Sequence, residues 1–149
     1  MMFISWILSL MILLQPNAPW KSDYENIATG IEQGAKRVPV FQGDSAVKMT
    51  IALDVSLAWY ESRYDRHAVG DHGTAHGLYQ VHAPEDETIE EQTVNANLLL
   101  KHSFKVCIAN PLNERLAWYA SGKGDGCENE GGRKASRHRM ATAMWLFRK

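Results

Sequence analysis

Residues 46–81, AVKMTIALDVSLAWYESRYDRHAVGDHGTAHGLYQV, decide the fold, because a long helical pattern meets a glycine-rich segment there. From Met49 to Tyr60, apolar side chains recur at helical spacing and form one broad face, with Asp44 or Ser45 available as the N-cap. Residues 65–84 contain several glycines and Pro84, which favour a loop or a short irregular strand. Glu61 therefore falls at the C-terminal end of the predicted helix, just before the loop.

Four further segments of the chain carry helical patterns with recognisable boundary signals. Capping boxes at Ser22-x-x-Glu25 and Thr88-x-x-Glu91 start two helices, the second running to about Cys107. Asn110-Pro111 starts a helix that ends at Gly122, and residues 122–132, with five glycines, form a surface loop. An amphipathic helix follows from Ser136 to Arg148, with Met140, Met144 and Phe147 facing inward. The sequence predicts a mainly α-helical bundle with a central glycine-rich active-site loop.

Length and composition indicate one globular domain. The chain has 149 residues, 45% hydrophobic and 22% charged, with a formal net charge of −1. These values exclude intrinsic disorder and a polytopic membrane protein. The near-neutral charge argues against a nucleic-acid partner, since nucleic-acid binders carry a strong basic excess. Two cysteines are too few for a disulfide-rich scaffold or a four-thiolate zinc site.

The N-terminus is strongly apolar. Residues 2–14 are interrupted only by Ser5 and Ser9, and as a helix they would span roughly 20 Å, short of the roughly 30 Å of a bilayer core. The length fits a signal peptide or membrane anchor over residues 1–20, with the domain at 21–149. No basic residue precedes the run and no A-x-A site follows it, so a buried helix is the alternative. Export would permit a disulfide between Cys107 and Cys127, in the periplasm, the cell envelope or outside the cell.

The surroundings of Glu61 point to acid chemistry. It stands among Trp59, Tyr60 and Tyr64 at the end of its helix, where the helix dipole and apolar neighbours both disfavour a charged carboxylate. A neutral carboxylic acid is the group that protonates a glycosidic oxygen. The competing interpretation is a solvated glutamate at a helix end.

Three short motifs occur in an order that resembles a known family. Glu61-Ser62, then Gly77-Leu78-Tyr79-Gln80, then Ala117-Trp118-Tyr119-Ala120-Ser121-Gly122 resemble the motifs of lysozyme-like soluble lytic transglycosylases. The run Gly70-Asp71-x-Gly73 is similar to goose-type lysozymes. The resemblance covers about residues 20–148 and implies an α+β lysozyme-like fold. Each motif is short, and only their combination is specific.

The resemblance implies roles for individual residues. Glu61 matches the catalytic acid, Ser62 the serine that orients reacting groups, and Gln80 a glutamine that lines the sugar cleft. Tyr119 matches the aromatic residue that packs against the acid or the substrate. Tyr79 replaces the usual methionine and is expected in the cleft wall. Ala120 replaces the usual asparagine, which removes an amide that binds sugar.

The number of carboxylates separates two reactions. Glycoside cleavage commonly needs two. The resemblance implies that one suffices in a lytic transglycosylase, where the muramic acid C6 hydroxyl attacks its own anomeric carbon and Glu61 acts as acid and then base. Asp71 offers the alternative of an inverting, goose-type muramidase in which it positions water. Asp71 is also a common turn residue, and the sequence leaves both interpretations open.

Histidines and charge runs raise further possibilities. His72 and His76 are four residues apart, but the glycines around them exclude the helix that would present both to one metal, so no metal or other cofactor is expected. His76 is instead a candidate for the sugar cleft. Five acidic residues in 85–91 and six basic residues in 133–149 are interpreted as a pair of solvated helical faces that could lie opposite each other. Alternatively Arg137, Arg139 and Arg148 contact anionic wall polymers or a membrane.

The sequence therefore predicts an enzyme that cleaves the β-1,4 bond between N-acetylmuramic acid and N-acetylglucosamine in peptidoglycan. Its partners would be glycan strands and, through the N-terminus, a membrane. The rival hypothesis is a catalytically silent wall-binding or structural module. Either protein would suit a phage virion or a secretion apparatus.

Overall fold

The computed structural model describes residues 2–84, 86–122 and 126–149. The α-helices within these ranges are α1 (Ile4–Leu14), α2 (Tyr24–Arg37), α3 (Ala46–Ser62), α4 (Ile89–Val106), α5 (Ala117–Ser121) and α6 (Glu130–Phe147). Strands β1 (Val69–Gly70) and β2 (Ala75–His76) form a small antiparallel hairpin, with Val69 opposite His76. The prediction of a mainly helical fold is confirmed.

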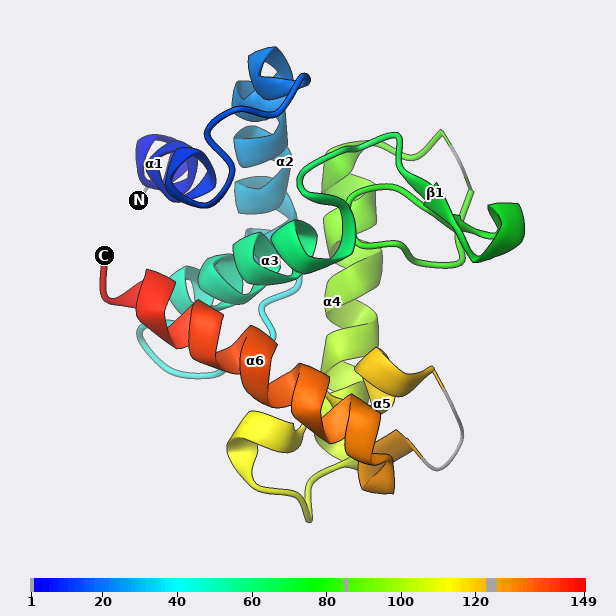
Figure 1. The fold of residues 1–149 in the computed structure, drawn as a ribbon. Coiled ribbons are helices and arrows are strands. Elements are labelled where there is room, and N and C mark those ends of the chain that lie inside the picture. The colour runs from blue at the N-terminus through cyan, green and yellow to red at the C-terminus, as the bar shows by residue number, and fades with distance from the viewer. Residues whose placement is uncertain (1, 85, 123–125) are drawn as a thin grey trace.

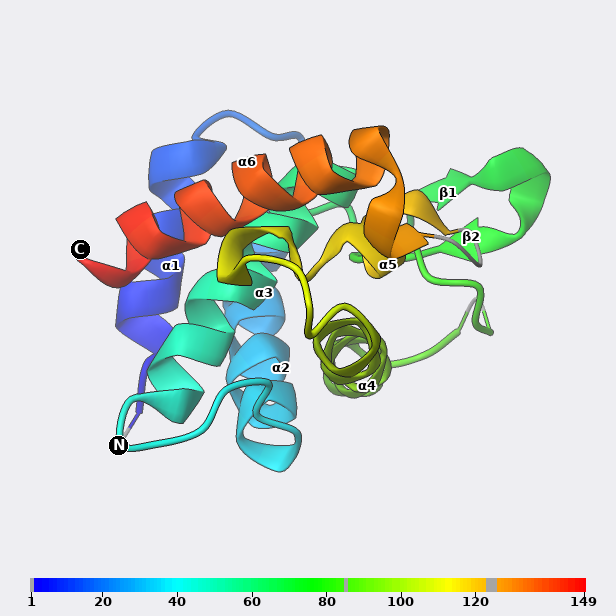
Figure 2. The same ribbon diagram turned by 90° about the horizontal axis from the view of Figure 1, so that it is seen from below.

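Helix α3 is the centre of the fold. Every residue from Thr50 to Ala58 is buried, because α2 and α1 cover one side of α3 and α6 crosses the other (Figure 1). Seen from below, α4 runs nearly end-on and the β1–β2 hairpin projects from the edge of the molecule opposite α1 (Figure 2). The C-terminal end of α3, which carries Glu61, leads into that hairpin.

Helices α2 and α4 pack closely because two glycines face α4. A Cβ atom at Gly30 would lie 2.5 Å from Ile89, and one at Gly34 would lie 2.5 Å from Thr93. No side chain fits at either position without displacing α4. This close approach fixes α4 against the fold and brings Thr93 and Gln92 beneath the central loop.

The N-terminal helix is part of the hydrophobic core. Ile7, Leu10 and Met11 are at most 1% exposed and pack with α2 and α3. The turn after α1 is held by Gln15, whose carbonyl accepts from the Tyr24 hydroxyl at 2.7 Å and whose Oε1 accepts from Trp59 Nε1 at 3.1 Å. Residues 4–14 therefore form a buried helix, which is the alternative to a signal peptide or membrane anchor. Among the described residues, no helix has the length and apolar character needed to cross a membrane.

The predicted helix starts have mixed outcomes. Thr88 forms its capping box, accepting from the Glu91 backbone N–H while the Glu91 side chain accepts from the Thr88 N–H. The box at Ser22 is wrong, because residues 21–23 form a 3₁₀ turn and Asp23 precedes α2. Ser45 precedes α3, but its side chain makes no capping bond.

The C-terminal third also departs from the prediction. The helix expected from Asn110 to Gly122 is divided into a 3₁₀ turn, η3 (Leu112–Glu114), and the short α5, which ends at Gly122 as expected. Helix α6 begins at Glu130, not Ser136, because Asn129 caps it by accepting from the Gly132 N–H. The predicted surface loop is correspondingly shorter, and residues 123–125 within it lie outside the described residues. Met140 faces inward, whereas Met144 is 38% exposed.

Candidate active site

Glu61 lies in the last turn of α3, where the chain reverses sharply. Arg63 and Tyr64 both have left-handed backbone conformations, with φ of 53° and 66°. Such conformations cost about 1–3 kcal/mol each for residues other than glycine, so they require support. The Tyr64 hydroxyl donates to the Val55 carbonyl at 3.0 Å, and Trp20 Nε1 donates to the Arg63 carbonyl at 3.0 Å. The end of α3 is therefore rigidly held.

The Glu61 carboxylate faces an arginine of α6. Arg139 Nη2 donates to Glu61 Oε1 at 3.1 Å, and the two side chains are only 17% and 24% exposed. The same guanidinium lies over the Tyr60 ring, 4.9 Å from its centroid. Among the described residues, Glu61 Oε2 has no hydrogen-bond partner. Arg139 thus fixes one carboxylate oxygen and leaves the other free.

This pairing corrects two expectations from the sequence. The sequence predicted aromatic and apolar surroundings for Glu61, but the charged side chain of Arg139 is also its direct neighbour. Arg139, considered above as a wall-contacting residue, lies inside the site, because the carbonyl of Arg139 accepts from Ser56 and so holds α6 against α3. Spacing along the chain cannot reveal this contact, since Arg139 follows Glu61 by 78 residues.

Tyr119 from α5 completes the cluster around Glu61. Burial of the hydroxyl raises the pKa of Tyr119 well above its ordinary value; the Glu61 carboxylate raises it further, and Arg139 opposes the shift. Tyr119 therefore remains a neutral phenol. Its hydroxyl donates to the Tyr79 carbonyl at 3.4 Å, so it contacts the central loop as well. Tyr119 thus lies close enough to Glu61 to be influenced by its charge.

Ser62 fastens the central loop to α3. Its hydroxyl donates to the Leu78 carbonyl at 2.7 Å, and the Ala58 carbonyl lies within 3.0 Å of the same oxygen. The Leu78 N–H in turn donates to Gln92 Oε1 at 2.8 Å. Ser62 thereby positions the loop beside Glu61.

Gln80 also acts within the loop. Its Nε2 donates to the carbonyls of Ala68 and Gly77, each at 2.9 Å, so both amide hydrogens are used inside the hairpin. Its backbone φ of 50° turns the chain at this point. A side chain at position 70 would collide with Gln80 Oε1, and Gly70 avoids this collision. The amide expected to line a sugar cleft instead holds the hairpin closed.

Tyr79 and His76 are themselves part of the central loop. Tyr79 is 2% exposed and its hydroxyl shares a 2.9 Å hydrogen bond with Thr93, so its side chain packs in the core. His76 pairs in the hairpin, and its Nδ1 is buried without a partner. A small pocket here is lined by His76, Gly77, Tyr79, Val81, Ala83, Pro84, Glu87 and Gln92. Glu61 does not line this pocket.

Asp71 belongs to the β1–β2 hairpin. It begins the turn η2 (Asp71–Gly73) at the end of the hairpin, with φ of 49° and a side chain that is 70% exposed. Its Oδ2 lies 3.0 Å from His82 Nε2, and its carbonyl accepts from Thr74. Among the described residues, Asp71 and Glu61 share no hydrogen-bond or ion-pair partner; Glu61 pairs with Arg139 of α6. Within the described ranges, no group of three histidine, cysteine or acidic residues could hold a metal ion.

The aromatic residues near the motifs divide into two sets. Tyr64 and Tyr79 are fully enclosed in the core. The others are partly exposed and surround Glu61 or α5, where flat rings can stack on sugars: Trp59, Tyr60, Trp118 and Tyr119.

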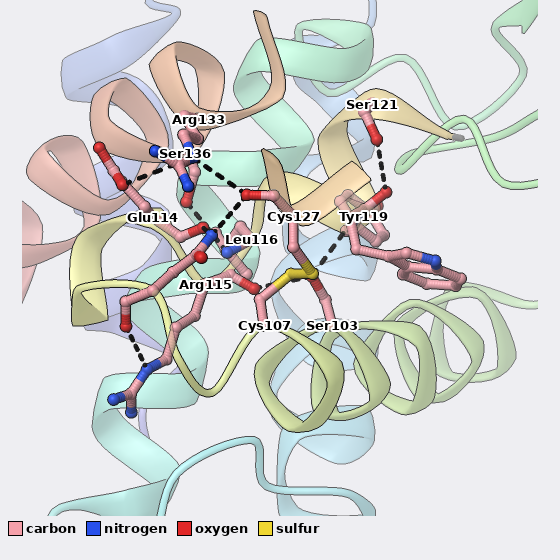
Figure 3. Close-up of a disulfide and its surroundings, with 12 residues drawn as sticks. Ser103, Cys107, Glu114, Arg115, Leu116, Tyr119, Ser121, Cys127, Arg133 and Ser136 are labelled. Atoms are coloured by element: carbon pink, nitrogen blue, oxygen red, sulfur yellow. Dashed lines mark hydrogen bonds and ion pairs between the residues drawn. A yellow bond between two sulfur atoms is a disulfide. The ribbon is translucent and has the colours of Figure 1, made fainter. Parts of the chain in front are cut away.

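The predicted disulfide is present and supports α5. Cys107, at the end of α4, is bonded to Cys127 in the turn η4 (Gly126–Glu128), with Cα atoms 5.2 Å apart (Figure 3). The Cys127 carbonyl accepts from Asn110 Nδ2 at 2.7 Å and from Arg133 Nε at 3.0 Å. Ser103, one turn before Cys107, accepts from the Tyr119 N–H at 3.2 Å. The disulfide thus lies in the network that holds the Tyr119 helix.

The acidic and basic runs do not face each other as expected. Arg137 of the basic run donates at 2.7 Å to Glu114, a residue outside the acidic run. Glu90 of the acidic run pairs at 3.3 Å with Arg37 of α2, a residue outside the basic run. Glu85, the first acidic residue of the run, lies outside the described residues.

Comparisons of this chain with protein-family models, curated proteins and solved structures find no match.

Proposed function

We propose that this protein cleaves the β-1,4 bond between N-acetylmuramic acid and N-acetylglucosamine in peptidoglycan, with Glu61 as the catalytic acid and base. The observation that carries the proposal is the convergence of three separate motifs. Ser62 is bonded to the Leu78 carbonyl, Tyr119 to the Tyr79 carbonyl, and Tyr119 is electrostatically coupled to Glu61. A structural protein has no need to gather these groups around one partly exposed carboxylate.

The two oxygens of Glu61 have different roles in the proposed reaction. Oε1 accepts from Arg139, which orients the carboxyl group. For the forward step Oε2 first takes up a proton from solvent, so that the ion pair of the resting site becomes a carboxylic acid still hydrogen-bonded to Arg139. Oε2–H protonates the glycosidic oxygen as the bond to the muramic acid C1 breaks, and the N-acetylglucosamine chain leaves with a free C4 hydroxyl. The muramic acid C6 hydroxyl then attacks C1 and its proton returns to Oε2. The products are a 1,6-anhydro end and an intact enzyme.

Ser62, Gln80 and Tyr119 are positioning residues in this scheme. Ser62 and Gln80 keep the loop in one conformation beside the helix end, and the Tyr119 hydroxyl remains neutral next to Glu61. The partly exposed rings of Trp59 and Tyr60 are the surfaces on which sugar rings stack. The disulfide suits an exported protein that acts at the cell envelope or from a phage or secretion machine.

Product analysis tests the reaction type. Purified peptidoglycan is digested with the full-length protein and the products are separated and weighed by mass spectrometry. The proposed mechanism gives 1,6-anhydro-muramyl ends, 18 Da lighter than reducing ends, which is the mass of the one water not consumed. Exclusively reducing ends would contradict transglycosylation and support hydrolysis with water positioned by Asp71. No soluble product from the folded protein would support a silent wall-binding module.

A further inference from the structure

The outer face of α1 is exposed and uncharged. Met2, Ile12 and Leu13 are 78%, 43% and 51% exposed, while the opposite face of the helix is buried in the core. The polar residues beside them are Ser5 and Ser9. We call these five residues the α1 face. Residues 2–20 contain no acidic or basic side chain, so nothing in this segment makes the face strongly hydrophilic.

This pattern is unusual for a helix at the surface of a globular domain. Such a helix normally buries one apolar stripe and carries charged residues on the other side. Helix α1 has apolar residues on both sides. Exposed apolar surface of this kind marks an interaction site.

Basic side chains lie beside Trp6 of α1 and at the end of α6. Lys48 Nζ of α3 lies 5.2 Å from the Trp6 ring centroid and 4.7 Å from the Phe147 ring centroid, so α1 and the last turn of α6 meet at this lysine. At the end of α6, Lys149 Nζ lies 4.4 Å over the Trp145 ring, which is 42% exposed. Figures 1 and 2 both show α1 and the C-terminus at one edge of the molecule, opposite the β1–β2 hairpin.

The positive charges at this edge are not neutralised by the fold. Among the described residues, Lys48, Arg148 and Lys149 form no ion pair, whereas Arg133, Arg137 and Arg139 earlier in α6 all do. In the neighbouring groove, Lys36 is paired with Glu32 at 2.6 Å, so the positive charge of this edge rests on Lys48, Arg148 and Lys149 and not on the groove. Apolar residues flanked by tryptophan and unpaired basic residues match a bilayer interface that carries anionic headgroups.

We propose that the α1 face docks the folded protein onto an anionic phospholipid surface, with α1 lying in the plane of the interface. Ile12 and Leu13 enter the apolar boundary, and Lys48, Arg148 and Lys149 contact the headgroups. Docking in this plane requires no unfolding, because Ile7, Leu10 and Met11 stay in the core. A second copy of the chain is a poorer occupant, since it would bring two positively charged rims together.

Vesicle flotation tests this proposal with the full-length protein. Vesicles of phosphatidylcholine alone are compared with vesicles that contain 30% phosphatidylglycerol (about one lipid in three, a typical anionic fraction). The variant Ile12→Asp/Leu13→Asp alters only exposed side chains and should bind the anionic vesicles at least about tenfold more weakly. The variant Arg148→Gln/Lys149→Gln should bind the anionic vesicles at least about tenfold more weakly at low salt. Its binding should also lose most of its dependence on salt concentration.

The matched control is Leu98→Asp/Ile108→Asp. Leu98 and Ile108 are 53% and 62% exposed, on α4 and just after it, away from the α1 face. This variant should bind vesicles like the unaltered protein, and circular dichroism should show that all variants are folded. The proposal is overturned if the folded protein does not float with anionic vesicles, or if the control loses as much binding. It is also overturned if sedimentation shows a dimer that Ile12→Asp/Leu13→Asp dissociates, or if the mature protein lacks residues 1–20.

Discussion

The Glu61–Arg139 pair should be measurably coupled in stability, because both side chains are largely enclosed. At an effective dielectric constant near 20, unit charges about 4 Å apart attract by about 4 kcal/mol, and desolvation cancels much of this gain. Exposed pairs retain only about 0.2–1 kcal/mol. With side chains 24% and 17% exposed and 3.1 Å apart, Glu61 and Arg139 should retain about 1–2 kcal/mol of coupling. Arg139 also packs on Tyr60, so its loss alone should cost more than the loss of Glu61.

A double-mutant cycle with Glu61→Gln and Arg139→Met measures this coupling. Urea unfolding is followed by circular dichroism for the unaltered protein, both single variants and the double variant. Arg37 and Glu90 provide the control pair, since they are 3.3 Å apart but 57% and 34% exposed, and their coupling should be about 0.5 kcal/mol or less. A Glu61–Arg139 coupling no larger than that of the control pair would refute the enclosed ion pair described here.

Three other predictions concern stability. Replacing Cys107 and Cys127 by alanine should lower the free energy of unfolding by about 3 kcal/mol, measured in urea, and a loss below about 0.5 kcal/mol would contradict the disulfide. Burial raises the pKa of Asp54 well above its ordinary value, so the folded state holds its proton more tightly and stability should fall as pH rises from about 4. Asp54→Asn should flatten that fall, and an unchanged pH profile would argue against a buried acid. Ile7→Ala should cost about 2–5 kcal/mol and Ile12→Ala less than about 1 kcal/mol in thermal unfolding, since Ile7 is 0% and Ile12 43% exposed; equal losses would contradict the packing of α1.

Local sequence signals predicted the parts of the fold that depend on neighbouring residues. Thr88 has the extended backbone that a cap requires, so its box with Glu91 forms. The same pattern at Ser22 fails because the chain enters α2 through a 3₁₀ turn, which leaves Asp23 in the preceding position. Both capping-box patterns have the same residue spacing, so the spacing alone does not predict which of the two forms.

Asn129 caps α6 at Glu130, and tertiary packing accounts for Gly132 in its first turn. Adjacent glycines at 131 and 132 disfavour a helix by propensity. A Cβ atom at Gly132 would lie 2.6 Å from the Ala117 carbonyl oxygen, so this glycine allows α6 to approach α5. That contact with a distant segment outweighs the local preference, and the helix starts six residues before the predicted position.

The candidate site was predictable in its motif residues but not in their partners. Glu61 at the helix end and Cys107 with Cys127 follow from local patterns or from counting. Arg139 belongs to a basic run whose pattern predicts a solvated helical face, and only the crossing of α6 over α3 brings it to Glu61. Gln80 matches a sugar-binding position, yet its amide is used by the backbone of its own hairpin.

The most direct test of the proposed enzyme is the rate at which soluble muropeptides are released from purified peptidoglycan by the unaltered protein and by Glu61→Gln. Glu90→Gln is the matched control, since Glu90 also pairs with an arginine but lies on α4. Loss of the acid should reduce the rate about 10²–10⁴-fold with the fold intact, while Glu90→Gln stays near the original rate. Equal rates for the unaltered protein and the folded Glu61→Gln variant would contradict the account.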